Sequence, residues 1–151
     1  MSDKLAKLIA TFFYVGGIPK APGTAASVMG CLIAVIFTNN LLLYILVTAI
    51  VIFLGFKVCS QVEASIGTKD PSCIVIDEVA GMLIALFLLP INGPILVTAF
   101  FLFRAFDMFK IYPVNKFEQL PGAQGIMWDD LFAGIYTNIA MHLAICWAGI
   151  F

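Results

Sequence analysis

The charged residues of this chain are confined to three blocks, and this segregation constrains the fold more than any other feature. The blocks cover residues 3–20, 57–78 and 104–130. The segments without any charge are 21–56, 79–103 and 131–151. A helix that crosses a bilayer needs about 20 predominantly apolar residues. The charge-free segments therefore predict membrane-spanning helices joined by charged turns.

The overall composition excludes an ordinary water-soluble domain. Hydrophobic residues make up 62% of the chain and charged residues 11%, and the mean hydropathy is +1.07. Soluble domains are nearer half apolar and a quarter charged, so lipid must cover the excess apolar surface. The net charge of −1 provides no basic patch for nucleic acid. We expect a single membrane-embedded domain over 1–151.

The charge-free segments divide into about five short helices. The first segment is long enough for two helices that turn at the polar residues 38–40, and the last forms one helix. The middle segment contains two prolines and a glycine within 90–94, which is a strong helix-breaking signal. It therefore predicts a hairpin of helices at about 74–89 and 94–108. The predicted fold is an all-α polytopic membrane helix bundle of transmembrane or half-spanning helices.

The hairpin places every charged block on one face of the bilayer. As a single span, the middle segment would put Asp77 and Arg104 on opposite faces, over about 30 Å apart. Because lysine and arginine gather in the two central loops, the charged face is predicted to be cytoplasmic. The N-terminal segment 1–20 is expected to lie in the interface as an amphipathic helix capped by Ser2, with Lys4 and Lys7 toward water.

Five carboxylates lie at predicted helix ends on the charged face. They are Asp77 and Glu78 at one helix start, Asp107 at a helix end, and Asp129 and Asp130 at the start of the last helix. Acidic side chains near membrane depth are costly and indicate function. Either pair alone could instead cap a helix or complement its dipole. Converging carboxylates need a counter-cation, and their hard oxygen atoms suit Mg²⁺.

Two other features could hold a phosphate. Arg104, Asp107 and Lys110 follow i, i+3, i+6 spacing, so neighbouring members lie close on one helix side. They could bind a phosphate, or form intrahelical ion pairs with the lysine reaching the headgroups. The Pro-Gly turn at Gly23 and Thr24 precedes a helix expected to start at Thr24 or Ser27, and the free N–H groups of a helix start favour phosphate.

The sequence offers no pair of nucleophile and base for covalent catalysis by serine or cysteine. His142 is the single histidine and lies about 18 Å deeper along the last helix than Asp130. Its expected role is a hydrogen bond between helices.

Four segments resemble the phosphatidylglycerophosphatase A family. They are APGTAAS at 21–27, IVIDEVAGM at 74–82, FRAFDMFK at 103–110 and GIMWDDLFAG at 125–134. The corresponding family patterns read approximately PGTxGS, VxDExxGM, FRxxDxxKPxP and GxGIMxDDxxAG, in the same order. Four positions depart from features of the family: Ala26 for glycine, Ile76 for tryptophan, Ile111 for proline and Pro121 for histidine. None of these changes removes a carboxylate or the lysine.

The resemblance implies a bacterial inner-membrane enzyme with a cytoplasmic active site. It would remove the terminal phosphate of the phospholipid phosphatidylglycerophosphate with Mg²⁺ as cofactor, leaving phosphatidylglycerol. We expect the metal ligands to be Glu78, Asp107, Asp129 and Asp130, with Asp77 as a further ligand or as the base for water. The phosphate ligands are expected to be Gly23, Thr24, Arg104 and Lys110.

Three other functions compete with this interpretation. A small ion- or proton-coupled transporter would also use intramembrane carboxylates and broken helices, but it places them near the midplane. A CDP-alcohol phosphotransferase would carry a D-G-x-x-A-R signature, which the sequence lacks. A non-catalytic scaffold has no need of five half-buried carboxylates.

Overall fold

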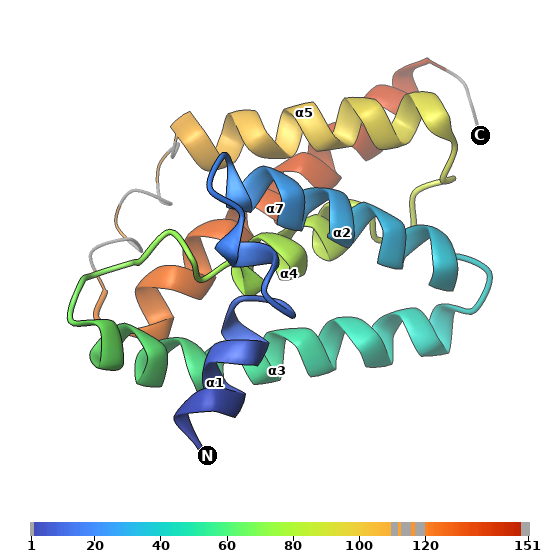
Figure 1. Cartoon of the computed structure of the whole chain (residues 1–151). Helices are drawn as coiled ribbons and strands as arrows, with labels where there is room; N and C mark the ends of the chain where they lie inside the picture. The colour runs from blue at the N-terminus through green and yellow to red at the C-terminus, as the bar shows by residue number, and fades with distance from the viewer. Residues whose placement is uncertain (1, 110–111, 113–115, 117–119, 149–151) are drawn as a thin grey trace.

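The protein is a bundle of helices (Figure 1). The computed structural model describes the chain except residues 1, 110–111, 113–115, 117–119 and 149–151, and the described residues contain helices and turns but no strand. The helices are α1 (Asp3–Ala10), the short 3-10 helix η1 (Val15–Gly17), α2 (Pro22–Phe37), α3 (Leu41–Ile66), α4 (Ile76–Ala85), α5 (Gly93–Phe109) and α7 (Ala123–Trp147). The predicted all-α class is confirmed.

The first charge-free segment folds into two helices, as predicted. The turn at 38–40 separates α2 from α3, and the Oδ1 atom of Asn40 accepts a hydrogen bond of 3.1 Å from Leu43 N, which caps α3. The predicted start of α2 at Thr24 or Ser27 is wrong, because the helix already begins at Pro22. Proline suits the first turn of a helix, where its missing N–H has no partner to lose.

The middle segment forms the predicted hairpin, but its first helix is shorter than 74–89. Helix α4 ends at Ala85, and α5 begins at Gly93. Carbonyl groups near the end of α4 accept hydrogen bonds from side chains of other helices. The Tyr44 hydroxyl donates to Leu83 O at 2.7 Å, and Asn138 Nδ2 donates to Phe87 O at 2.8 Å. These partners let α4 stop inside the bundle without leaving buried carbonyls unpaired.

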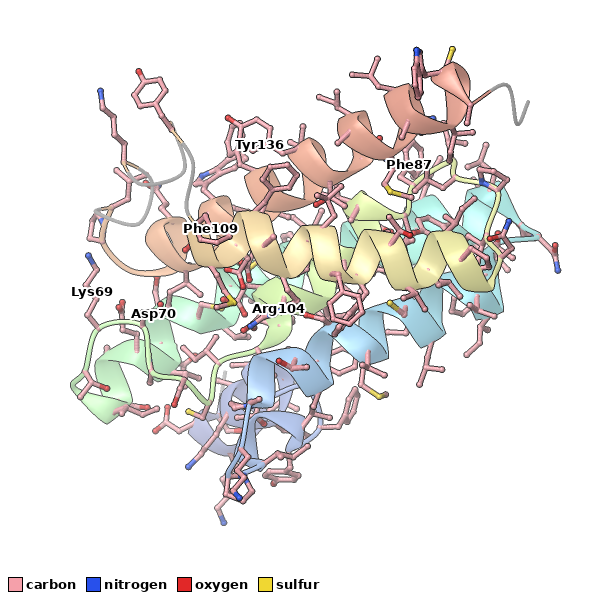
Figure 2. The ribbon with its side chains drawn as sticks, turned by 90° about the horizontal axis from the view of Figure 1, so that it is seen from above. Lys69, Asp70, Phe87, Arg104, Phe109 and Tyr136 are labelled. Carbon is pink, nitrogen blue, oxygen red and sulfur yellow. The ribbon has the colours of Figure 1, made fainter. Side chains whose placement is uncertain are left out.

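His142 takes part in the same interaction. Its Nε2 atom lies 3.3 Å from Phe87 O, and a carbonyl oxygen can only accept, so the ring presents an N–H at this position. The predicted packing hydrogen bond of His142 is confirmed, but its partner Phe87 lies in the turn after α4 and not within a helix. Figure 2 labels Phe87 near the end of the bundle opposite Asp70.

Helix α4 occupies the centre of the bundle and packs against α2, α3 and α7. Most of its residues are buried, including Val79, Ala80 and Met82. The crossing with α7 is close because a side chain on Gly81 would lie 2.6 Å from the carbonyl oxygen of Asp130. Small residues permit this kind of backbone approach between helices.

The N-terminal helix α1 crosses α3 (Figure 1). Ala6 and Ala10 are buried in this contact, whereas Lys4 and Lys7 are exposed. The predicted cap by Ser2 is wrong, since Ser2 occupies the cap position but its side chain makes no capping hydrogen bond. The segment is also tied to the start of α4, because Val75 N donates to Ala10 O at 3.0 Å.

Among the described helices, α3 alone is long and apolar enough to cross a membrane by length and composition. Its most apolar window has a mean hydropathy of 2.6, and 22% of that window is buried, so most of its apolar surface faces outward. Helix α2 is apolar but shorter. Large apolar side chains such as Phe53, Phe101 and Leu143 are also exposed on three different helices. The polytopic arrangement stays a prediction.

Candidate active site

A polar cavity of about 290 Å³ lies at one end of the bundle, and we call it the acidic cavity. It is formed by the starts of α2 and α4, the last turns of α5, the first half of α7 and the loop before α4. Its lining residues are Ala21, Pro22, Gly23, Thr24, Asp70, Ser72, Ile74, Asp77, Glu78, Arg104, Asp107, Asp129 and Asp130. All five carboxylates singled out in the sequence therefore face one space, as the hairpin predicted.

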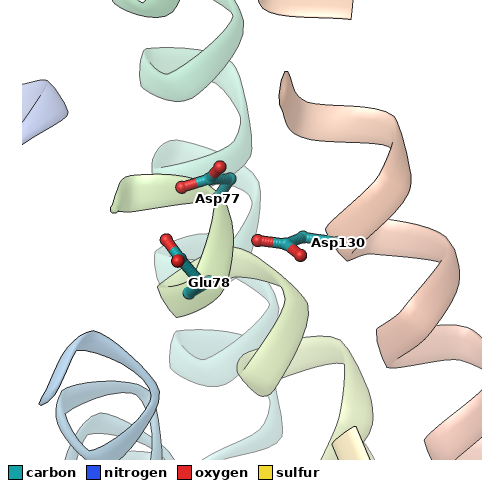
Figure 3. A group of neighbouring side chains, drawn as sticks. All are labelled: Asp77, Glu78 and Asp130. Atoms are coloured by element: carbon teal, nitrogen blue, oxygen red, sulfur yellow. The ribbon is translucent and has the colours of Figure 1, made fainter. Parts of the chain in front are cut away.

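Three of these carboxylates form a compact group, the acidic trio of Asp77, Glu78 and Asp130. One oxygen atom from each lies within 4.8 Å of the other two, and Figure 3 shows the three side chains pointing toward one another from α4 and α7. Asp77 Oδ1 and Glu78 Oε2 are buried and have no hydrogen-bond partner among the described residues. Buried oxygen atoms without a partner in the described chain leave room for a further ligand at this group.

The electrostatics of the trio favour a cation. Burial raises the pKa of Asp77 well above its usual range, and the charges of Glu78 and Asp130 raise it further. The pKa of Asp130 is raised in the same direction by burial, and then by Asp107, Glu78 and Asp129. All three residues lie in charged blocks, Asp77 and Glu78 directly before the charge-free segment 79–103 and Asp130 directly before 131–151. Three crowded oxygen donors that resist ionisation together fit a hard divalent cation such as Mg²⁺.

A positively charged side chain also lines the acidic cavity. Arg104 Nη1 lies 2.7 Å from Asp107 Oδ2, so the predicted i, i+3 proximity on α5 is confirmed as an ion pair. Asp107 lines the acidic cavity but lies outside the compact trio. Lys110, the third member of the predicted set, lies outside the described residues. Arg104 is therefore the cation that the structure places beside the acidic trio.

Gly23 brings the start of α2 close to Glu78 and Arg104. The Oε1 atom of Glu78 occupies the space that a side chain on Gly23 would take, and Arg104 Nη1 would lie 3.4 Å from that side chain. Gly23 and Thr24 stand in the first turn of α2, where N–H groups have no partner within the helix. One corner of the cavity therefore holds the free N–H donors of this turn, the Arg104 guanidinium group and the Glu78 carboxylate.

The expectation that Asp129 and Asp130 begin the last helix is wrong. Helix α7 begins at Ala123, whose N–H donates to Ser60 Oγ at 2.7 Å. Both aspartates therefore lie inside the helix, beyond its first turn. The alternative that they cap the helix start is excluded. Asp129 Oδ1 accepts a hydrogen bond of 3.0 Å from Asp130 N, and Asp129 lines the cavity outside the trio.

The trio differs from the metal ligands expected from the sequence. It contains Asp77, which the sequence left as a ligand or a base, whereas Asp107 and Asp129 line the same cavity outside the trio. Which carboxylates bind a metal stays a prediction. The sequence identified all five carboxylates but could not show which of them lie close together, because the distances between helices depend on how α4 and α7 cross.

Two cavity residues escaped the sequence analysis, Asp70 and Ser72. Asp70 has a left-handed backbone (φ 46°) and its N–H donates to Glu63 Oε1 at 3.1 Å. Aspartate adopts this conformation more readily than most residues. The available signal was the Asp70-Pro71 turn, but this turn lies in a loop, whereas the carboxylates predicted as site residues lie at predicted helix ends.

Comparison with known proteins decides the family. The pattern of the family Phosphatidylglycerophosphatase A matches residues 8–145, which is nearly the whole chain. This chain belongs to the phosphatidylglycerophosphatase A family. The family predicted from the four motifs is confirmed, and every residue of the acidic trio falls within the matched range.

Three relatives extend the comparison. A phosphatidylglycerophosphatase A of Haemophilus influenzae is 36% identical over 93% of this chain and 88% of its own length. A phosphatidylglycerophosphatase A of Escherichia coli is 38% identical over 86% of this chain and 77% of its own length. A Bacteroides thetaiotaomicron protein with the provisional name phosphatidylinositol-3-phosphatase is 35% identical, covering 93% of both chains. These names support the predicted class of enzyme, a lipid phosphatase. No solved structure matches this chain significantly.

Proposed function

We propose that this chain hydrolyses the terminal phosphate of phosphatidylglycerophosphate, releasing phosphatidylglycerol and inorganic phosphate. The observation that carries the proposal is the acidic trio, which lies beside Arg104 and the start of α2 in a single cavity. A phosphate monoester needs positive charge and N–H donors around its oxygen atoms. Family membership and the two relatives with this name favour phosphatidylglycerophosphate as the lipid.

Asp77, Glu78 and Asp130 would hold Mg²⁺, and Asp107 and Asp129 line the same cavity. The fit rests on the unpartnered oxygen atoms of Asp77 and Glu78 and on the oxygen-only donor set. When bound, the ion supplies positive charge that polarises the phosphoryl group and eases attack by water.

The remaining residues act on the phosphate and on the water. Arg104 offsets the negative charge of the phosphoryl oxygens, and the N–H groups of the first turn of α2 with the Thr24 hydroxyl donate hydrogen bonds to them. Lys110 would add a second cation, as the sequence predicts. Asp107 or Asp129 accepts the proton that the attacking water loses, because Asp77 belongs to the trio in this proposal.

We further propose that the bundle is a multi-pass protein of the bacterial inner membrane, with the acidic cavity at the cytoplasmic face. The exposed apolar surface of α3 supports contact with lipid. The turns at 38–40 and 86–92 carry no charge, whereas the charged loop before α4 contributes Asp70 to the lining of the cavity. This arrangement leaves acyl chains in the bilayer while the headgroup reaches the site.

The test is phosphate release from phosphatidylglycerophosphate by purified protein in detergent, with and without Mg²⁺. Phosphatidylinositol 3-phosphate serves as the comparison lipid, because the Bacteroides thetaiotaomicron relative is named as a phosphatidylinositol-3-phosphatase. We expect Mg²⁺-dependent release from phosphatidylglycerophosphate and loss of release in Asp130→Asn, with Asp3→Asn at the surface as the control. Release without Mg²⁺, or full activity in Asp130→Asn, would contradict the proposal. Ion flux into vesicles without phosphate release would favour the transporter.

A further inference from the structure

An open apolar groove lies between α2 and α5, with a volume of about 320 Å³. Its walls are Val28 and Cys31 on α2 and Leu96, Val97, Phe100 and Phe101 on α5. Every one of these side chains is apolar, and none belongs to the acidic cavity. The groove is open at the surface of the bundle, and α2 and α5 make only limited contact with each other there.

The groove continues from the acidic cavity on the same two helices. Thr24 lines the cavity, and Val28 and Cys31 follow it at i+4 and i+7, so the three share one face of α2. On α5, Arg104 lines the cavity, and Phe101 and Val97 lie one and two turns before it on the same side. Figure 2 shows Arg104 between α5 and α2.

This juxtaposition matches the shape of a phospholipid. Charged and hydrogen-bonding groups gather at Thr24 and Arg104, and about one helical turn away the lining becomes wholly apolar. The groove residues are also open to the surroundings, with Val28 45%, Val97 57% and Phe101 66% exposed. A molecule with an anionic head and an apolar chain can therefore occupy both parts at once and enter sideways from the bilayer.

A second apolar cavity, lined by Phe12, Ile33 and Val47 among others, lies between α1, α2 and α3. It is separated from the acidic cavity by the packing of α2 against α4, where a side chain on Gly30 would lie 2.7 Å from Met82 Cβ. Only the groove between α2 and α5 shares its helix faces with Thr24 and Arg104 among the described cavities.

We propose that the groove between α2 and α5 binds an acyl chain of the phospholipid substrate. The proposal rests on the proposed function, since it assigns the place of the chain whose headgroup occupies the acidic cavity. Packing against the groove walls, and not exclusion from water, holds the chain, because surrounding lipid is equally apolar. The groove thereby positions the phosphate opposite Arg104 and makes the enzyme prefer substrates with long acyl chains.

The kinetic test compares two forms of phosphatidylglycerophosphate, one with long acyl chains in detergent micelles and one with short chains dissolved as monomers. Val28→Trp and Val97→Trp fill the groove from opposite walls. Leu46→Trp is the matched control, because Leu46 is an exposed apolar residue (52%) on α3 that lines none of the described cavities. We expect kcat/KM for the long-chain lipid, divided by that for the short-chain lipid, to fall about ten-fold (about 1.4 kcal/mol) in both groove variants. The ratio should not change in Leu46→Trp.

An unchanged ratio in both groove variants would overturn the groove proposal while leaving the phosphatase activity intact. Failure of the proposed function has a different result, since wild-type protein would then release no phosphate from either lipid. If the wild-type protein releases no phosphate, a binding measurement still tests the groove. A phospholipid with a photoreactive acyl chain and the same headgroup should label α2 and α5 at the groove, and labelling spread evenly over the apolar surface would contradict the proposal.

Discussion

The backbone carbonyl of Gly81 occupies the space that a side chain on Gly134 would fill, so α4 and α7 touch through their main chains. Each glycine lies one helical turn beyond a member of the acidic trio, Gly81 after Asp77 and Gly134 after Asp130. The close crossing therefore sets the separation of the carboxylates. Any side chain placed between the helices would push the two halves of the trio apart.

Gly134→Ala should lower both stability and activity. The added methyl group meets the Gly81 backbone, which cannot move aside as a flexible side chain can, and we expect a cost of about 1–3 kcal/mol. Thermal unfolding in detergent and phosphate release measure the two effects. Gly93→Ala is the control, because nothing lies within 4 Å of the space its side chain would take. Equal stability of the two variants would contradict the close crossing.

Gly23→Ala should reduce activity with little loss of stability. The new side chain would displace the Glu78 carboxylate, the flexible end of a long side chain that can rotate away. Because Glu78 is a proposed metal ligand, we expect the apparent affinity for Mg²⁺ to fall about 10- to 100-fold. Titration of activity with Mg²⁺ measures this change. Gly17→Ala, with open space around it, should retain the wild-type affinity.

Asp130→Asn should stabilise the metal-free protein while abolishing activity. The substitution removes one of three crowded carboxylates, of which Asp77 and Asp130 are buried and Glu78 is half-buried, and a gain of about 1 kcal/mol would raise the melting temperature by about 2–4 °C. Added Mg²⁺ should then stabilise the wild type but not the variant. Unfolding curves with Mg²⁺ and with a chelator measure both effects. A variant that is less stable than wild type without Mg²⁺ would argue against repulsion within the trio.

Binding of Mg²⁺ should weaken as the pH falls. Burial raises the pKa of Asp77 and Asp130, so protons compete with the ion for these carboxylates. For the metal-free protein, a raised pKa in the folded state means that stability is highest at low pH and declines as the pH rises past the unfolded value of about 4. Mg²⁺ should offset this decline. An apparent dissociation constant that stays flat between about pH 8 and pH 5 would contradict the assignment.

Tyr44→Phe should destabilise the protein more than Tyr136→Phe. Tyr44 is buried and its hydroxyl donates to Leu83 O at 2.7 Å, so its removal leaves a buried carbonyl unpaired at a cost of about 1–3 kcal/mol. Tyr136 donates to Tyr112 O in an exposed contact, where water replaces the lost bond. Chemical or thermal unfolding measures the difference. Similar effects of the two changes would show that the end of α4 does not depend on Tyr44.

Local chemistry explains the successful sequence predictions. The polar turn at 38–40 and the prolines within 90–94 prevent a continuous helix through short-range effects, so the existence of both breaks was predictable from the sequence. The early end of α4 at Ala85 was not, because it depends on hydrogen bonds from Tyr44 and Asn138 on other helices. The start of α7 at Ala123 likewise depends on Ser60, which is distant in the sequence.

The same division applies to the candidate site. Charge segregation and the four motifs, read from the sequence alone, determined the family, the five carboxylates and the end of the bundle where they gather. Tertiary structure decided which three carboxylates form the trio, and it added Asp70 and Ser72 to the cavity. The physical reason is that helix ends are set by neighbouring residues along the chain. Distances between carboxylates on different helices are set by the Gly81–Gly134 crossing and by the fit of Glu78 against Gly23.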